Sequence, residues 1–274
     1  MVAVHNFSYG LLNPALGYLV SCLGAFLGLR CVTRARAHAG RQRARWMILA
    51  AVSIGATGVW AMHFIAMLGF TIPGQTITYN VPITIASMLI AIAVVGIGLF
   101  TVGFGDGGVT RLLIGGVVVG IGVATMHYLG MAAMIMPDSM SYNWPLFGLS
   151  VVIAIVAGTT ALWLGTWVRG IWATIGAAAI MGVAVSGMHY TGMAAMRVMP
   201  GMMSSASGAT AVSFLIPLLL GITLITFVMS LAISLSPTEE EIREDAAMRG
   251  RIEALRQQEA GSVRIRTNSK KSYR

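Results

Sequence analysis

Three copies of one short motif carry the residues best suited to chemistry. They read Met62-His63-Phe64-Ile65-Ala66-Met67, Met126-His127-Tyr128-Leu129-Gly130-Met131 and Met188-His189-Tyr190-Thr191-Gly192-Met193. Their regular recurrence along the chain indicates an internal repeat. Imidazole nitrogen and thioether sulfur are both metal ligands, so the motif predicts a metal or cofactor site.

The spacing within each copy places a histidine and a methionine on one helix face. Residues four apart on a helix lie one turn apart, and each copy holds such a pair: His63 and Met67, His127 and Met131, His189 and Met193. Met134 and Met196 follow the second and third histidines by seven residues and would extend the same helical stripe. Further candidates are Met62, Met126 and Met188, which point to a neighbouring wall, and His5, which could cover the site.

The elements that position these motifs are predicted by composition. The 274-residue chain is 57% hydrophobic and 10% charged, whereas soluble domains average about a quarter charged. Only Asp106 and Asp138 of its nine acidic residues precede residue 238. The basic residues stand between apolar runs and not among aromatic residues on a folded face, which argues against nucleic-acid binding. The sequence therefore predicts an integral membrane protein.

Seven apolar runs are long enough to cross a bilayer, which takes roughly 20 residues. They cover residues 10–32, 47–70, 83–104, 112–136, 145–168, 173–196 and 211–235. The fold class is therefore all-α, a polytopic bundle of seven transmembrane helices with three two-helix repeats plus one helix and a short cytoplasmic helical tail. We expect a membrane domain over 1–235 and a charged tail over 236–274.

The distribution of basic residues predicts the orientation. One side of the membrane collects 17 of the 18 lysines and arginines, and Arg197 alone lies on the other side. Because cytoplasmic segments carry the excess of positive charge, we expect the N-terminus outside and the tail inside. The motif histidines then lie in the outer half of the membrane.

The tail begins with a capping box, Ser236-Pro237-Thr238-Glu239, and predicts a charged helix over 237–259. Residues 262–274 are basic and suit anionic lipid headgroups. The tail is too short to hold a cyclase, phosphodiesterase or kinase domain. We therefore expect any output to pass through a cytoplasmic partner.

The ligand types indicate which metal the site would bind. Thioether sulfur selects Cu(I), and hard cations prefer carboxylates, which are missing from the motif. All proposed ligands are neutral, so a monovalent cation leaves the least uncompensated charge in a site of low dielectric constant. Copper is therefore favoured, with haem second because histidine and methionine are also its axial ligands. A methionine stripe is also typical of flexible packing, but ionisable groups inside a membrane span are functional by default.

The triple M-H-[FY]-x-[AG]-M pattern and the seven spans resemble the MHYT family of bacterial integral membrane sensor domains, over about residues 5–235. The third copy reproduces the signature as Met188-His189-Tyr190-Thr191, whereas the first departs from it at Phe64 and Ile65. The resemblance implies a sensor in the bacterial inner membrane that binds copper and detects oxygen, carbon monoxide or nitric oxide. Members are commonly fused to domains that make or degrade cyclic di-GMP, or to kinases, and no such domain is expected here.

The leading hypothesis is therefore a copper-binding membrane sensor of a diatomic gas or of redox state. The alternatives are a copper transport or delivery protein and a haem-binding membrane protein. No nucleophile, base and orienting group are arranged for catalysis, so we do not predict an enzyme. The spacing leaves open whether the three histidine–methionine pairs form one site or three.

Overall fold

The computed structural model describes residues 4–104, 108–200 and 208–236, and residues 244, 247–253 and 255–256 of the tail. The chain forms two compact units, Met1–Ser234 and Leu235–Arg274. The described tail residues are helical, as predicted for 237–259, and the basic stretch 262–274 lies outside the described residues.

Among the described residues, seven helical segments are long and apolar enough to cross a membrane, so the predicted all-helical, multi-pass fold is confirmed. The segments are α1 (Leu12–Ala37), α2–η1–α3 (Gly40–Val52, Ser53–Ala61 and Met62–Met67), α4 (Val81–Gly103), α5 (Val109–Ala132), α6 (Trp144–Trp167), α7 (Ile171–Ala195) and η2–α8 (Ala211–Leu215 and Ile216–Leu235). The segments η1 and η2 are π-helical. A helix suits the bilayer because its backbone groups bond to one another, where no water can satisfy them.

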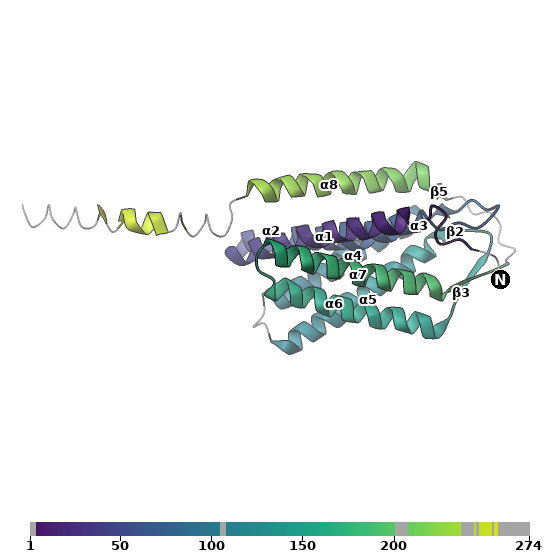
Figure 1. The fold of residues 1–274 in the computed structure, drawn as a ribbon, viewed down its shortest axis with the longest axis horizontal. Coiled ribbons are helices and arrows are strands. Elements are labelled where there is room, and N and C mark those ends of the chain that lie inside the picture. Colours follow the sequence, from purple (N-terminus) through teal and green to yellow (C-terminus); the bar gives the residue numbers. More distant parts are fainter. Residues whose placement is uncertain are drawn as a thin grey trace, which may run out of the picture. The chain divides into compact units, whose positions relative to one another are not determined.

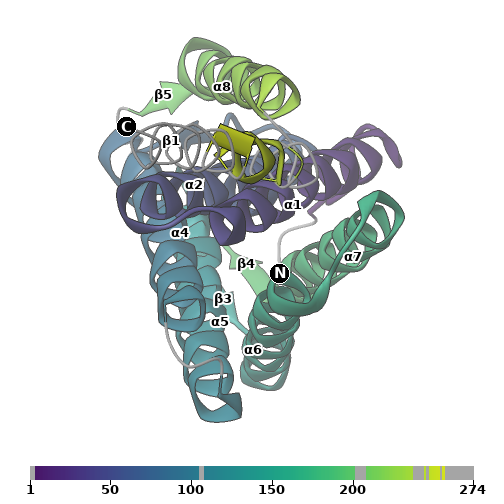
Figure 2. The ribbon, with the colours of Figure 1, turned by 90° about the vertical axis from the view of Figure 1, so that its left-hand side faces the viewer.

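Six of the spanning segments form a closed ring, with α8 outside it. Successive neighbours in the ring are α1, α2–η1, α4, α5, α6 and α7, and α7 packs back against α1 (Figure 2). The helix α8 runs beside α1 and the second segment. Its contacts with them include two hydrogen bonds: Thr57 Oγ1 lies 2.8 Å from Thr226 Oγ1, and the Arg34 guanidinium donates to the Ile233 carbonyl.

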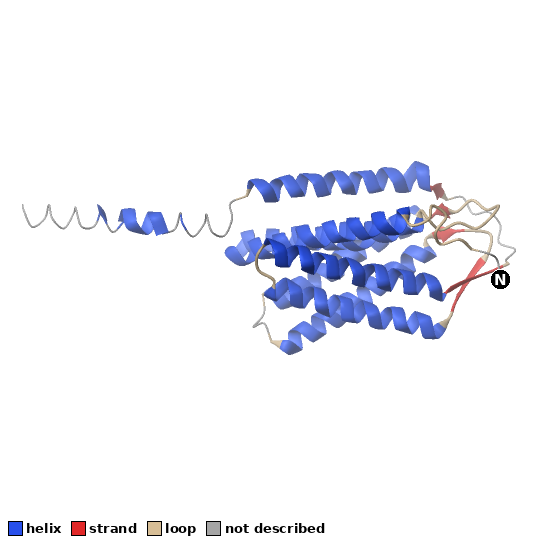
Figure 3. Ribbon diagram, viewed as in Figure 1, coloured by secondary structure: helices blue, strands red, loops and turns tan. Residues whose placement is uncertain are grey.

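The described part of the chain has five short strands. They lie together at one end of the bundle, which we call the strand end (Figures 1 and 3). They are β1 (Thr78–Tyr79), β2 (Met134–Ile135), β3 (Ser139–Tyr142), β4 (Met196–Met199) and β5 (Ala209–Thr210). The strands form two antiparallel sheets, in the orders β2-β1-β5 and β3-β4. The first sheet joins the segments that follow α3 and α5 to the segment that precedes η2, and the second sheet joins the segments that follow α5 and α7.

The strands correct one sequence prediction. The helix α5 ends at Ala132 and α7 ends at Ala195, so Met134 and Met196 lie in β2 and β4 and do not extend the helical stripe. The physical reason is that the last turn of a helix leaves backbone carbonyls open, and here the chain leaves the helix to pair with a strand. Apolar composition continues past the helix ends and could not reveal this change.

Candidate metal centre

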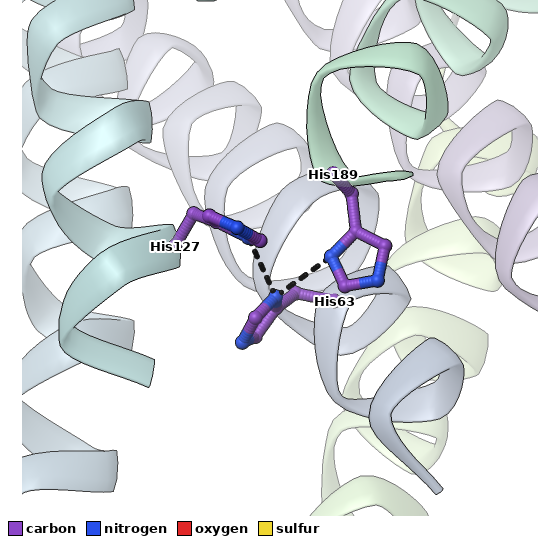
Figure 4. Close-up of side chains that lie close together, drawn as sticks. All are labelled: His63, His127 and His189. Carbon is purple, nitrogen blue, oxygen red and sulfur yellow. Dashed lines mark hydrogen bonds between the residues drawn. The ribbon is translucent and has the colours of Figure 1, made fainter. Parts of the chain in front are cut away.

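Three histidines from three different spanning segments meet inside the ring, towards the strand end. His63 lies on α3, His127 on α5 and His189 on α7, and each side chain is at most 1% exposed. Their rings point towards one another (Figure 4). Within the part of the chain that the structure describes, they are the one group of three or more His, Cys, Asp or Glu side chains close enough to hold a metal ion.

In each repeat, an asparagine near the start of the first helix (α1, α4 or α6) is hydrogen-bonded to the end of the motif helix that follows. The Asn13 side chain donates to the Ile65 carbonyl over 2.7 Å. Backbone N–H groups do the same in the other two repeats: Asn80 bonds to Ala133 and Asn143 to Ala195, both over 2.8 Å. These bonds close the open end of each helical hairpin and fix the depth of its histidine.

Asn80 and Asn143 also begin their own helices. Their side chains accept hydrogen bonds from the backbone N–H groups of Ile83 and Leu146, and a proline stands in each first turn. Asparagine is a favoured N-cap residue, and proline fits the first turn because its missing N–H would have no helical partner. The same local sequence signal therefore starts α4 and α6 beside the motif helices.

The Nδ1 atoms of the three rings converge. His63 Nδ1 lies 3.0 Å from His189 Nδ1 and 3.1 Å from His127 Nδ1. One ligand nitrogen from each ring can be chosen so that all three lie within 4.8 Å of one another. Three nitrogens bound to one metal at about 2.0 Å in a trigonal plane lie about 3.5 Å apart, so small ring movements would suit one ion. The geometry favours one shared site over three.

The donor set itself fits a cation. A neutral imidazole carries one N–H and one lone pair, and His63 Nδ1 faces both other Nδ1 atoms. A single proton between two rings cannot satisfy the third, whereas a cation can accept a lone pair from each. The Nε2 atoms of His63 and His127 are also buried without a hydrogen-bond partner among the described residues.

Glycines of neighbouring repeats make room for two of the rings. A Cβ atom at Gly130 would lie less than 3 Å from His63 Nε2, and one at Gly192 would collide with His127 Nε2 in the same way. The first repeat has Ala66 at the corresponding motif position. The small residue of the motif therefore has a role that spacing alone did not reveal, because it receives the imidazole of another repeat.

The aromatic residue that follows each histidine packs against its ring. The ring centroids of His63 and Phe64, His127 and Tyr128, and His189 and Tyr190 are 4.7, 4.9 and 4.9 Å apart, close to perpendicular. Tyr128 also lies 2.6 Å, oxygen to oxygen, from Ser150. The aromatic position of the motif thus restrains the orientation of the histidines, with or without a hydroxyl group.

The other predicted ligands lie in the core or at the surface. All eight candidate methionines are at most 7% exposed, and seven of them belong to the buried hydrophobic cluster: Met67, Met126, Met131, Met134, Met188, Met193 and Met196. Met62 is 1% exposed. His5 is exposed, its backbone pairs with Thr71, and it is not part of the histidine cluster. The imidazoles are therefore what the fold brings together, and methionine ligation stays a prediction.

No carboxylate belongs to the histidine group among the described residues. Burial raises the pKa of Tyr79, on β1, to about 12, so its hydroxyl keeps its proton. Asp138 is the one carboxylate among the described residues of 4–236. It accepts a hydrogen bond from Gln75 over 2.8 Å and is not part of the histidine group. A bound cation would thus have no carboxylate in this group to balance its charge, which favours a single positive charge over a double one.

In a comparison with known families, the chain matches the MHYT family three times, over residues 57–115, 120–178 and 182–241. This family is described as "Bacterial signalling protein N terminal repeat". Each matched segment contains one motif histidine. No solved structure matches the chain.

Curated relatives are longer proteins. The bifunctional diguanylate cyclase/cyclic di-GMP phosphodiesterase MucR of Pseudomonas aeruginosa is 34% identical over 86% of this chain and 35% of its own length. The cyclic di-GMP phosphodiesterase NbdA of the same species is 36% identical over 70% of this chain and 25% of its own length. The signaling protein YkoW of Bacillus subtilis is 28% identical over 66% of this chain and 23% of its own length. The chain thus aligns to between 23% and 35% of the length of each of these relatives, and the matched repeats are signalling repeats.

Proposed function

Because the chain belongs to the MHYT family of bacterial membrane signalling proteins, we propose that it is a sensor that binds copper through His63, His127 and His189. The observation that carries the proposal is the convergence of three buried Nδ1 atoms from three spanning segments. Met67, Met131 and Met193 stand one turn beyond the histidines and are the candidate sulfur ligands.

The chemistry of the ligands supports Cu(I). Neutral imidazole and thioether groups suit a soft monovalent ion. Copper bound here would supply a centre that changes oxidation state and can bind oxygen, carbon monoxide or nitric oxide. The residues of the chain hold the rings at fixed angles, exclude water by burial, and link three separate helices to one point. A change at that point would alter the packing of α3, α5 and α7 together.

We propose that the protein lies in the bacterial inner membrane with its N-terminus outside and its tail in the cytoplasm. The support is the gathering of 17 of its 18 basic residues on one side of the spans, which is typical of the cytoplasmic side. The strand end and the histidines then face the outside. The segments after residue 235 would carry the output to a cytoplasmic partner, and the cyclic di-GMP enzymes among the relatives indicate one class of partner.

The test is to purify the protein and measure bound copper. Wild type is expected to hold copper, and a variant with His63, His127 and His189 all changed to alanine is expected to lose it. His5→Ala is the matched control, because His5 is exposed and outside the cluster. Equal copper in wild type and the triple variant would refute the proposal.

The same samples separate the alternative functions. A Soret band in the purified wild type would show that the protein binds haem, and would favour haem over copper as the bound group. Copper uptake into vesicles that contain the protein would indicate transport instead of sensing. The expected results are no Soret band and no uptake above that of vesicles that contain the triple variant.

A further inference from the structure

A cavity of about 40 Å³ lies within the bundle, about one helical turn from the histidine cluster and towards the middle of the bundle. Its walls come from η1, α4, α5, α6 and α7. Three of its lining residues are equivalent in the three repeats: Val59, Val123 and Val185 each stand four residues before a motif histidine. Since four residues make about one helical turn, the three valines form a layer one turn away from the imidazoles.

The contents of such a cavity are constrained by its walls. Every lining side chain is apolar, and most of the lining residues are buried. A water molecule needs two to four polar partners, so a cavity with apolar walls stays dry and takes up apolar guests. An apolar cavity of about 150 Å³ stays dry and binds benzene or xenon. The present cavity has about a quarter of that volume, so it suits one apolar guest smaller than benzene.

One residue connects the cavity to the outside of the bundle. Ala157 of α6 lines the cavity and also a groove of about 540 Å³ on the outward face of α6 and α7. The groove is lined mainly by aliphatic residues, and it lies within the spanning segments. Apolar molecules concentrate in apolar surroundings, so a guest dissolved in the membrane can collect in the groove, and Ala157 is the residue that the groove and the cavity share.

Met188 belongs both to the wall of the cavity and to the third motif. It lines the cavity, is 1% exposed, and immediately precedes His189. A guest in the cavity would therefore contact a motif residue as well as the valine layer.

We propose that this cavity binds one small apolar molecule, such as a diatomic gas, and holds it one helical turn from the histidine cluster, in contact with Met188. The identification of that molecule as a sensed gas rests on the proposed function, whereas the binding site itself rests on the shape and composition of the cavity. Entry proceeds from the membrane, through the α6–α7 groove and past Ala157.

Xenon is the probe, because it is apolar, close to the required size and visible by anomalous diffraction. Crystals of the full chain pressurised with xenon should show one xenon atom enclosed by Val59, Val123 and Val185. Ala154 of α6 lines the cavity and is 1% exposed, so Ala154→Val should abolish that peak. The matched control is Ala179→Val on α7, which lines the outer groove only and should keep the peak.

A gentler variant keeps the test decisive if Ala154→Val does not fold. Val123→Ile adds one methylene group to the same cavity and should reduce xenon occupancy at least several-fold. Absence of xenon from the cavity of the wild type, or equal occupancy in wild type and both filled variants, would overturn the inference.

Copper measured in the same proteins distinguishes this inference from the proposed function. If the wild type binds copper but no xenon enters the cavity, the metal site is supported and the cavity proposal is refuted. If xenon enters the cavity but the triple histidine substitution leaves bound copper unchanged, the cavity proposal is supported and the metal site is refuted. Copper content should be the same in wild type, Ala154→Val and Ala179→Val.

Discussion

The first repeat differs from the second and third although all three carry the same motif. Its motif helix follows a nine-residue π-helix, η1, whereas α5 and α7 are α-helical throughout. Its span is also the most enclosed. In the most apolar 18-residue stretch of each span, 78% is buried in this span, against 50% and 33% in the spans of the second and third motifs. His63 is the ring whose Nδ1 lies within 3.1 Å of both others.

The difference shows that equivalent positions in a repeat need not have equivalent roles. The three ring centroids are 4.9, 4.9 and 5.1 Å apart, but His63 Nδ1 is the atom that the hydrogen bonds join to both other rings, so we call His63 the central ring. It stands on the most buried of the three motif spans, and His127 and His189 approach it from two more exposed helices. π-Helical turns are frequent at functional sites, and here one leads directly to the central ring. We infer that the first repeat fixes the centre and that the other two complete it.

The largest effect should come from removing the central ring. His63→Ala takes away the nitrogen that neighbours both others, so Cu(I) affinity should fall by more than about 100-fold, beyond the 10–100-fold typical of residues that only orient a ligand. His127→Ala and His189→Ala should each lose less, because the remaining pair still includes His63. Competition with a Cu(I) chelator measures the three affinities.

Equal losses of Cu(I) affinity in the three single variants would show that the three rings contribute equally and that His63 has no special role. His5→Ala serves as the control and should bind as wild type does.

The next effect concerns the small residue of each motif. Gly130→Ala places a Cβ atom less than 3 Å from His63 Nε2, and the ring must turn away from the cluster. Cu(I) affinity should fall by about 10–100-fold, as for residues that orient a ligand. Helix propensity would not cause this loss, because alanine is favoured over glycine in a helix by about 1 kcal/mol.

Ala66→Gly is the reciprocal change in the first repeat. It removes a Cβ atom that the fold already accommodates, so Cu(I) affinity should stay within a few-fold of wild type. A larger loss in Ala66→Gly than in Gly130→Ala would show that the first repeat needs its methyl group and would reverse the assigned roles.

A third prediction tests the packing of the first repeat without touching the metal site. A Cβ atom at Gly24 of α1 would lie less than 3 Å from the backbone of Ser53 and Gly58 in η1. Because backbone atoms cannot turn aside, Gly24→Ala should lower the free energy of unfolding by about 1–3 kcal/mol, as overpacking does. Gly176→Ala on α7 is the control, since nothing lies within 4 Å of its added Cβ atom.

Denaturant unfolding in detergent micelles measures both variants. Equal stabilities of Gly24→Ala and Gly176→Ala would show that the first repeat is no more tightly packed than the third.

Much of this architecture could be predicted from the sequence. Two features suffice for the seven spans: runs of apolar residues of sufficient length and the charges that separate them. The repeat placed His63, His127 and His189 at equal depth on three helices that run in the same direction. Both results follow from local composition and from the period of the helix, which need no knowledge of distant contacts.

The remaining features depend on contacts between distant segments. Met134 and Met196 continue an apolar pattern, but strand pairing takes them out of their helices. The contact of Gly130 with His63 joins two repeats, and nothing in either motif alone reveals it. The layer of Val59, Val123 and Val185 is visible in the sequence as a third repeated position, although only the packing shows that it lines a cavity.

The smallest effect concerns the attachment of α8 to the first repeat. Thr226 Oγ1 donates to the Ile222 carbonyl over 2.8 Å, so it accepts from Thr57 Oγ1 across the helix pair. Hydrogen bonds between membrane helices contribute about 0.6 kcal/mol on average. A double-mutant cycle with Thr57→Val and Thr226→Val should give a coupling of about that size, measured by unfolding in micelles, and Thr223→Val, an exposed threonine on the same helix, should show no coupling to Thr57→Val. A coupling near zero would mean that α8 is held to η1 by apolar packing alone, whereas a measurable one would make this pair the direct connection between α8 and the segment that positions His63.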